Sequence, residues 1–249
     1  MTYVLLERLR QGHRTLPFPP TMAERFRGRP ELDPSRCPEG CASCREACPT
    51  GALTLRPLRL DLGACLVCGC CGARCPAGAL RFTRDHRLAA RSREDLVIGG
   101  GPRPAVPALE PGLRRLLGRS LKLRQVSAGG CGGCEAELNA LANVEFDAAR
   151  FGIRFVASPR HADGVVVTGP VTANMELALR ETWAATPGPK ILVAVGACAI
   201  SGGLFAGAGA TCDGVPRDLP TMLYIPGCPP HPMTVIDGLM RLLGRLPPD

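Results

Sequence analysis

The chain has 249 residues, of which 45% are hydrophobic and 21% are charged. This length suits one large domain or two small ones, and the composition excludes a largely disordered protein. The net charge is +8, almost all of it from arginine, because Lys122 and Lys190 are the only lysines. The arginines are scattered and aromatic residues make up only 4% of the chain, so we expect no nucleic-acid partner.

The start of the chain has no long apolar segment and no small-residue cleavage site, so it is unlike a secretory signal. No apolar run approaches the ~20 residues of a membrane-spanning helix. The longest run, Ile191 to Ile200, is half that length and contains Gly196. We therefore expect a soluble, cytoplasmic protein whose contact with a membrane comes only through a partner.

Cysteine is unusually frequent, with 14 residues in all, and the first group lies near the N-terminus. It reads Cys37-Pro-Glu-Gly-Cys41-Ala-Ser-Cys44-Arg-Glu-Ala-Cys48-Pro. This is the spacing of a bacterial [4Fe–4S] ferredoxin motif with one extra residue between the first two cysteines. The extra residue leaves open whether the site of Cys37 holds a full four-iron cluster.

The second group reads Cys65-Leu-Val-Cys68-Gly-Cys-Cys71-Gly-Ala-Arg-Cys75-Pro. Four of its cysteines have the ferredoxin spacing C-x2-C-x2-C-x3-C-P, and Cys70 is left over. Three thiolates on one short loop can bind three irons of one cubane. The fourth, which precedes proline, then binds the cluster of the other half.

An internal repeat follows each cysteine group, as Pro49-Thr-Gly-Ala-Leu and Pro76-Ala-Gly-Ala-Leu. It predicts two pseudo-symmetric halves, each with a cysteine loop, a short helix and a strand. Disulfides would need an oxidising compartment, and zinc usually takes two CxxC pairs. We therefore predict an α+β ferredoxin-like domain over residues 1–98 with two [4Fe–4S] clusters. One cluster is assigned to Cys37, Cys41, Cys44 and Cys75, and the other to Cys48, Cys65, Cys68 and Cys71.

A polar stretch from Thr83 onward becomes rich in glycine and proline, which is typical of a domain boundary. We predict a linker over residues 99–119. Four leucines are spaced as one face of a helix that packs against the next domain: Leu113, Leu116, Leu117 and Leu121.

The rest of the chain, residues 120–249, alternates apolar strands with helices. This pattern predicts an α/β, flavodoxin-like domain with a parallel sheet. The expected strands cover residues 123–126, 163–168, 191–195 and 222–225, and the expected helices cover residues 135–141, 173–186 and 233–243.

Four cysteines of this second domain lie in glycine-rich turns that follow three of the expected strands. Cys131 and Cys134 follow the first strand, and Cys198 and Cys228 each follow a later one. Ligands of such sheets bind at the carboxyl ends of the strands, so we expect these thiols to converge on a third [4Fe–4S] cluster. The alternative for any one of them is a small buried apolar residue. Cys212 does not follow a strand and is not assigned.

Glu135 directly follows Cys134. A carboxylate beside a buried cluster could take part in proton relay. The alternative, which we favour, is an acidic residue that interacts with the dipole at the N-terminus of a helix.

Several stretches of the second half together resemble one known family: Gly130-Cys-Gly-Gly-Cys-Glu, Asp147-Ala-Ala-Arg-Phe-Gly-Ile, Ser158-Pro-Arg-His-Ala-Asp, Val167-Thr-Gly-Pro-Val-Thr, Gly196-Ala-Cys and Tyr224-Ile-Pro-Gly-Cys-Pro-Pro. The family is the small, proximal-cluster subunit of formate hydrogenlyase-type (group 4) [NiFe] hydrogenases, which is similar to the 20 kDa subunit of complex I. The first half looks like the two-cluster ferredoxin subunit of the same complex. The chain therefore resembles a fusion of two neighbouring subunits.

This resemblance implies an electron-transfer subunit of a membrane-associated hydrogenase, with no catalytic site on this chain. The implied partners are the nickel–iron large subunit, membrane-arm subunits, and a donor such as formate dehydrogenase, CO dehydrogenase or ferredoxin. The alternative is a 20 kDa-type subunit of an NADH/quinone oxidoreductase. That subunit carries adjacent cysteines at its first ligand position, whereas two glycines separate Cys131 from Cys134 here, as in the hydrogenases.

Overall fold

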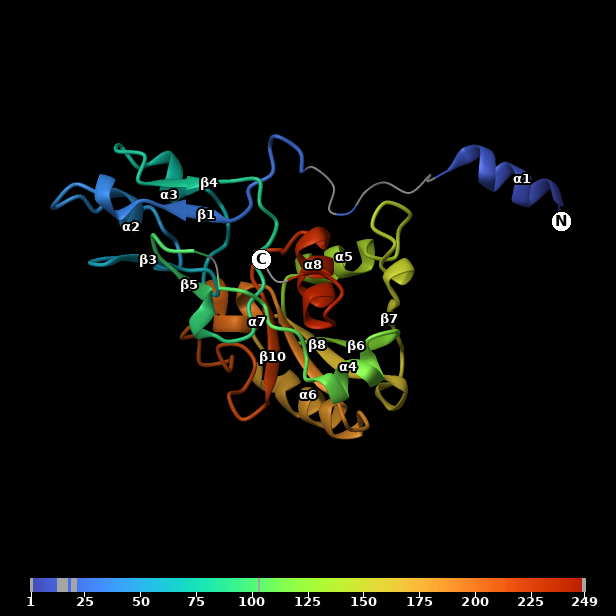
Figure 1. Ribbon diagram of the computed structural model, residues 1–249. Coiled ribbons are helices and arrows are strands. Elements are labelled where there is room, and N and C mark those ends of the chain that lie inside the picture. Colours follow the sequence, from blue (N-terminus) through green and yellow to red (C-terminus); the bar gives the residue numbers. More distant parts are fainter. Residues whose placement is uncertain (1, 13–17, 19–21, 103, 248–249) are drawn as a thin grey trace.

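The computed structural model describes residues 2–12, 18, 22–102 and 104–247 (Figure 1). Some residues of the expected domains and linker lie outside these ranges. Among them are Met1 at the start of the first domain, Arg103 in the linker, and residues 248–249 at the end of the second domain. We call residues 22–98 the first unit and residues 104–247 the second unit.

Helix α1 (Thr2–Gln11) stands apart from the rest of the molecule (Figure 1). Its apolar side chains are exposed, with Tyr3 77% and Leu9 81% accessible. Among the described residues, no helix combines the length and the apolar character that crossing a membrane requires.

The first unit is built from very short elements in two similar halves. In each half a cysteine loop leads into a one-turn helix and then into a strand, which agrees with the repeat in the sequence. Strand β1 pairs with β4, and β2, β3 and β5 form a second sheet, all antiparallel. The helices are α2 (Ser43–Glu46) and α3 (Cys70–Ala73), the 3₁₀ turns are Pro34–Arg36 and Glu94–Leu96, and the strands are β1 (Pro30–Leu32), β2 (Leu53–Leu55), β3 (Leu58–Asp61), β4 (Leu80–Phe82) and β5 (Val97–Ile98).

The second unit is organised around a five-stranded parallel sheet with the order β10-β9-β8-β6-β7. Numbered along this unit, the order is 2-1-3-4-5, that of flavodoxin-like sheets, as expected. Strand β7 was not expected, because it has only three residues and Arg154 interrupts its apolar pattern. The strands are β6 (Leu121–Ser127), β7 (Ile153–Phe155), β8 (Gly164–Thr168), β9 (Ile191–Val195) and β10 (Thr221–Ile225).

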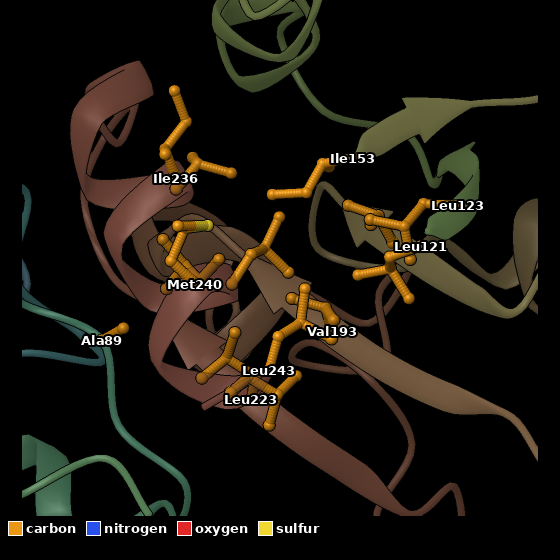
Figure 2. Packing of buried hydrophobic residues seen from close by; sticks show 14 of the residues in the cluster. Ala89, Leu121, Leu123, Ile153, Val193, Leu223, Ile236, Met240 and Leu243 are labelled. Carbon is orange, nitrogen blue, oxygen red and sulfur yellow. The ribbon is translucent and has the colours of Figure 1, made fainter. Parts of the chain in front are cut away.

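Helices cover both faces of this sheet, because alternate residues of each strand point to opposite sides. On β9, Val193 packs with α8 while Leu192 packs with α6. Figure 2 shows the core between α8 and the sheet, with Ile236 and Met240 above Leu223. The helices are α4 (Pro111–Leu117), α5 (Gly133–Ala140), α6 (Ala173–Ala185), α7 (Ala197–Ser201) and α8 (Pro232–Leu242), and the 3₁₀ turns are Ala148–Phe151, Pro159–His161 and Gly203–Phe205.

The end of the first unit and the residues that follow it lie against the second unit. Ala90 forms a β-bridge with Tyr224 on the edge strand β10, with backbone N–H···O distances of 3.0 and 2.8 Å. Further along, Val106 and Leu109 are buried in the core under α8, and the Leu109 amide donates to the Leu242 carbonyl at 2.8 Å. Val106 and Leu109, two residues of the expected linker, are therefore buried against the second unit.

The expected helical face of four leucines is only partly correct. Leu113 and Leu117 pack against the core from α4, but Leu116 is 64% exposed. Leu121 is fully buried, but it begins β6 and does not belong to the helix. The helix ends at Leu117 because Gly118 and the residues after it turn the chain into the sheet.

Candidate metal centres

The structure brings together cysteines from both halves of the first unit. Burial raises the pKa of the Cys44 thiol, and the nearby Cys75 and Cys37 raise it further. Cys75 therefore lies with the first cysteine group, although it belongs to the second in sequence. Cys41, on the same loop, has its thiol 3.8 Å from the hydroxyl of Ser43.

A second set has the reciprocal composition. Burial raises the pKa of Cys65 to about 12, and Cys71, Cys48 and Cys68 contribute to the increase. The pKa of Cys71 is raised to about 11 by the same causes: burial first, then Cys48 and Cys68. Cys48 belongs to the first group in sequence but lies here with the second, as the crossover rule expects.

The third set lies at the carboxyl ends of the parallel strands. Burial raises the pKa of Cys134 to about 12, and Glu135 and the thiols of Cys198, Cys228 and Cys131 add to this effect. The turns after β6, β9 and β10 supply these four cysteines. The first of these turns adjoins the point where the strand order reverses, between β6 and β8, the usual ligand position in such sheets.

Glycine allows the close approach of two of these turns. Gly196, between β9 and Cys198, has φ 91°, and a Cβ atom there would lie 2.5 Å from the Cys134 sulfur. Any larger residue would therefore push apart the turns that carry Cys134 and Cys198.

The donor atoms of all three sets fit iron–sulfur cubanes. All 14 cysteines are free thiols, and four cysteine sulfurs per cluster are the usual ligands. Backbone amides point at two of the sulfurs: Val67 donates to Cys65 at 3.3 Å, and Ala79 donates to Cys75 at 3.2 Å. Such bonds stabilise thiolate charge and tune cluster potentials. Across the described ranges, no three histidine, cysteine or acidic residues are grouped so as to hold a single metal ion.

The second and third sets adjoin each other across the two units. Cys68 is among the groups that raise the pKa of Cys228, after burial and Cys131. Both cysteines line a cavity of about 500 Å³ whose wall also contains Phe26 and His231. The rings of Phe26 and His231 meet edge to face with centroids 5.2 Å apart, so side chains of both units bound this space.

Glu135 anchors the turn that carries Cys131 and Cys134. Its Oε1 accepts hydrogen bonds from Ser127 at 2.5 Å and from Thr168 at 2.6 Å, at the ends of β6 and β8. Burial raises the pKa of Glu135, but these two hydrogen bonds and a backbone hydrogen bond together outweigh it, and the pKa is lowered. The carboxylate is thus held ionised and ties α5 to the sheet, an arrangement suited to positioning more than to proton relay.

The two unassigned cysteines differ from the twelve others in placement. Cys70 is exposed and begins α3, although its thiol interacts with Cys68. The Cys212 sulfur contacts the Glu176 carboxylate at 3.5 Å on the α6 side of the sheet. Neither has the placement shared by the other cysteines.

Some polar contacts near the sites could not be predicted from the sequence. Ser201 binds the Gly63 carbonyl in the other unit, and Arg93 pairs with Asp61. Residues 63 and 201 are 138 positions apart, and no motif links them, so only the three-dimensional structure could reveal this pair. The sequence drew attention to Glu135, because it directly follows Cys134, but it did not indicate the hydrogen-bond partners of this carboxylate.

Comparison with known proteins points to one family. The family model described as NADH ubiquinone oxidoreductase, 20 Kd subunit, matches residues 131–242, which contain the third cysteine set. The chain is 40% identical over 142 residues to formate hydrogenlyase subunit 7 of Escherichia coli. It is 39% identical over 134 residues to a probable membrane-bound hydrogenase subunit of Pyrococcus furiosus, and 39% over 114 residues to an NADH-quinone oxidoreductase subunit of Heliobacterium modesticaldum.

The extent of these matches differs. They cover 57%, 54% and 45% of this chain, respectively. The chain spans 56% of the E. coli subunit and 65% of the Heliobacterium subunit, but 80% of the Pyrococcus subunit. The match to the Pyrococcus protein thus includes most of a shorter relative.

Proposed function

Because the chain belongs to the family of the NADH ubiquinone oxidoreductase 20 kDa subunit, we propose that it is an electron-transfer subunit of a membrane-associated [NiFe] hydrogenase of the formate hydrogenlyase type. The observation that carries the proposal is the gathering of Cys131, Cys134, Cys198 and Cys228 at one edge of the sheet, beside Cys68 of the first unit. A row of adjacent sulfur sites is what an electron-transfer path requires.

The proposed ligands are twelve cysteines in three [4Fe–4S] sites. When bound, the clusters would accept and release single electrons. The first unit, as a ferredoxin-like domain, would hold two of them, and the second unit would hold one. The sets are Cys37, Cys41, Cys44 and Cys75; Cys48, Cys65, Cys68 and Cys71; and Cys131, Cys134, Cys198 and Cys228.

The chain's own residues would hold and insulate these sites. The Val67 and Ala79 amides donate to sulfurs of two different sets, and burial of Cys44, Cys65 and Cys71 excludes water from the first unit's sites. Removing water strengthens electrostatic interactions, so these contacts contribute to the cluster potentials. In this role no residue of the chain makes or breaks a substrate bond.

The proposed partners follow from the exposed sulfurs. Cys131 and Cys228 are exposed at the edge of the sheet, where a nickel–iron large subunit could cover the third site. The first unit would face the donor, a formate dehydrogenase, a CO dehydrogenase or a ferredoxin. Membrane-arm subunits would attach the assembly to the inner face of the cell membrane.

Metal analysis with EPR spectroscopy tests the proposal. The anaerobically purified full chain should contain about twelve irons, because three cubanes hold four each. The complex with its large subunit should show reduction of the clusters by hydrogen. A preparation with no third cluster, or a complex whose clusters hydrogen does not reduce, would contradict the proposed function.

A quinone-linked complex is the second candidate, since NADH-quinone oxidoreductase subunits match at similar identity. The two glycines between Cys131 and Cys134 favour the hydrogenase. Quinone-dependent oxidation of the clusters, together with a large subunit that lacks two CxxC pairs, would favour the alternative.

A further inference from the structure

We propose that a four-residue clamp between the two units, made by Asp61, Gly63, Arg93 and Ser201, sets the separation of the second and third cluster sites and thereby the rate of electron transfer between them. This inference rests on the proposed function and concerns residues that bind no cluster. Asp61 and Gly63 lie just before Cys65, and Ser201 lies three residues after Cys198.

The central contact joins segments that are far apart in the chain. The Ser201 hydroxyl donates to the Gly63 carbonyl at 3.0 Å, and its second partner is the Ala197 carbonyl of its own helix at 3.2 Å. Ser201 ends α7, the five-residue helix that carries Cys198 near its start. The contact therefore connects the helix of the second unit that carries Cys198 to the turn between β3 and the second cysteine group.

Gly63 leaves no room at this contact. A Cβ atom at residue 63 would lie 2.8 Å from the Arg93 guanidinium and 2.8 Å from Cγ2 of Ile200 on α7. Gly63 is buried, and Ile200 shares a core with Cys65 and Cys71. A side chain at this position would therefore push α7 away from the first unit.

Arg93 and Asp61 fix the other side of the clamp. Arg93 pairs with both carboxylate oxygens of Asp61, and the bond to Oδ1 is 2.6 Å. Asp61 Oδ1 also accepts from the Gly63 amide at 2.9 Å. The pairing with Asp61 raises the pKa of Arg93, so the guanidinium stays charged. A bidentate pair of this kind defines orientation as well as distance.

The geometry around the clamp favours a positioning role. The thiols of Cys68 and Cys228 are close enough to interact, yet a cavity of about 500 Å³ lies between their loops. An open cavity does not hold its two walls at a fixed distance. The clamp joins the two units through the segment just before Cys65 and supplies a rigid contact beside the two cysteine loops, in addition to the bridge between Ala90 and Tyr224.

The test is the distance between the reduced second and third clusters, measured by pulsed dipolar EPR on the full chain. Ser201→Ala should lengthen or broaden that distance and slow electron transfer between the two clusters, with all three clusters retained. Ser201→Thr keeps the hydroxyl and should restore the wild-type distance. Gly63→Ala should give a larger change in the same direction, because it adds bulk at the contact.

Matched controls separate the clamp from general effects on folding. Thr182→Ala removes a comparable bond within a helix, from Thr182 to the Ala178 carbonyl at 2.8 Å, and should change neither readout. Gly99→Ala adds a Cβ just after the first unit, where the nearest atom, the Leu58 carbonyl oxygen, is 3.7 Å away, and it should also have no effect.

Three results would overturn the inference. The first is a wild-type distance and a wild-type transfer rate in Ser201→Ala. The second is loss of the third cluster in that variant, which would make the contact a requirement for folding and not a positioning device. The third is a wild-type chain without three clusters, which iron analysis would detect before any variant is made, and which would refute the proposed function itself.

Discussion

The two units of the molecule hold their cysteines in opposite ways. In the first unit, most cysteines of each set come from one short loop, on a scaffold of strands no longer than four residues. In the second unit, the cysteines come from three strand ends of one sheet and are up to 97 residues apart, from Cys131 to Cys228. The first unit combines local spacing with a smaller core, whereas the second has a larger core that makes distant residues converge.

This difference has a thermodynamic consequence. The core of the first unit includes Cys44, Cys65 and Cys71 themselves, so the proposed clusters would be part of what holds this unit together. The strands β8 and β9 of the second unit are buried along their whole length. Small units with few apolar residues usually depend on metals or disulfides for stability.

Removal of the clusters should therefore have the largest effect and should affect the two units unequally. After anaerobic chelation, we expect backbone amides of residues 30–98 to lose most of their protection from hydrogen exchange. Amides of β6, β8, β9 and β10 should remain protected. Hydrogen exchange with mass spectrometry measures both, and equal loss of protection in the two units would contradict the comparison.

Substitution of a crossover ligand tests the local spacing. Cys75→Ala should remove the EPR signal of the cluster that Cys37, Cys41 and Cys44 help to bind, because the thiol of Cys75 lies with that set. The signals of the other two clusters should persist. Cys70→Ala is the control and should leave all three signals. If Cys75→Ala instead abolished the cluster of its own loop, the crossover assignment would be wrong.

Breaking a buried ion pair tests the core of the second unit. Asp237 and Arg241 on α8 are 2% and 7% exposed, and the Arg241 Nε donates to Asp237 Oδ2 at 2.9 Å. Asp237→Ala would leave the guanidinium buried without its carboxylate, and we expect a loss of about 3–5 kcal/mol in unfolding free energy. Denaturant unfolding of the second unit measures this loss. The substitution Leu116→Gln on the exposed side of α4 is the control, with an expected change within about 0.5 kcal/mol.

A smaller effect concerns pH at the contact between the units. His86 of the first unit is buried, its Nε2 lies 3.9 Å from Asp237 Oδ1, and burial lowers its pKa below 6.5. Asp237 and Asp85 oppose this shift, whereas Arg87 and Arg241 support it. The unfolded chain then binds a proton at a pH where the folded chain does not. The contribution of His86 to the free energy of unfolding is therefore fully present above the pKa of the unfolded chain, and it is lost as the pH falls below that value.

The variant His86→Gln should lack this pH-dependent contribution to stability. We expect the melting temperature to fall more in the wild type than in the variant when the pH is lowered from about 7.5 to about 5.5, a range that spans the ordinary histidine pKa. Thermal unfolding at both pH values measures the difference. Equal shifts in the two proteins would show that His86 does not contribute.

Much of this arrangement could be predicted from the sequence, and the reasons differ between the units. Cysteine spacing grouped Cys75 with the first loop, and continuous apolar strands predicted a parallel sheet with Cys198 and Cys228 at its edge. The sequence pattern failed at Leu116 and Leu121, because four leucines at helical spacing do not reveal where a helix ends and a strand begins. It also gave no indication of Ser201 and Gly63, since a contact between a hydroxyl and a backbone carbonyl leaves no pattern in the sequence.

The β-bridge between Ala90 and Tyr224 has a consequence for association of the protein with itself. An unpaired edge strand offers its backbone to any other chain, and β10 would be such an edge. Ala90 of the first unit occupies part of it, and the opposite edge, β7, is only three residues long. Because the two units are parts of one polypeptide, Ala90 stays beside β10 and protects this edge against strand-to-strand aggregation, which two separate polypeptides could provide only while they remain associated.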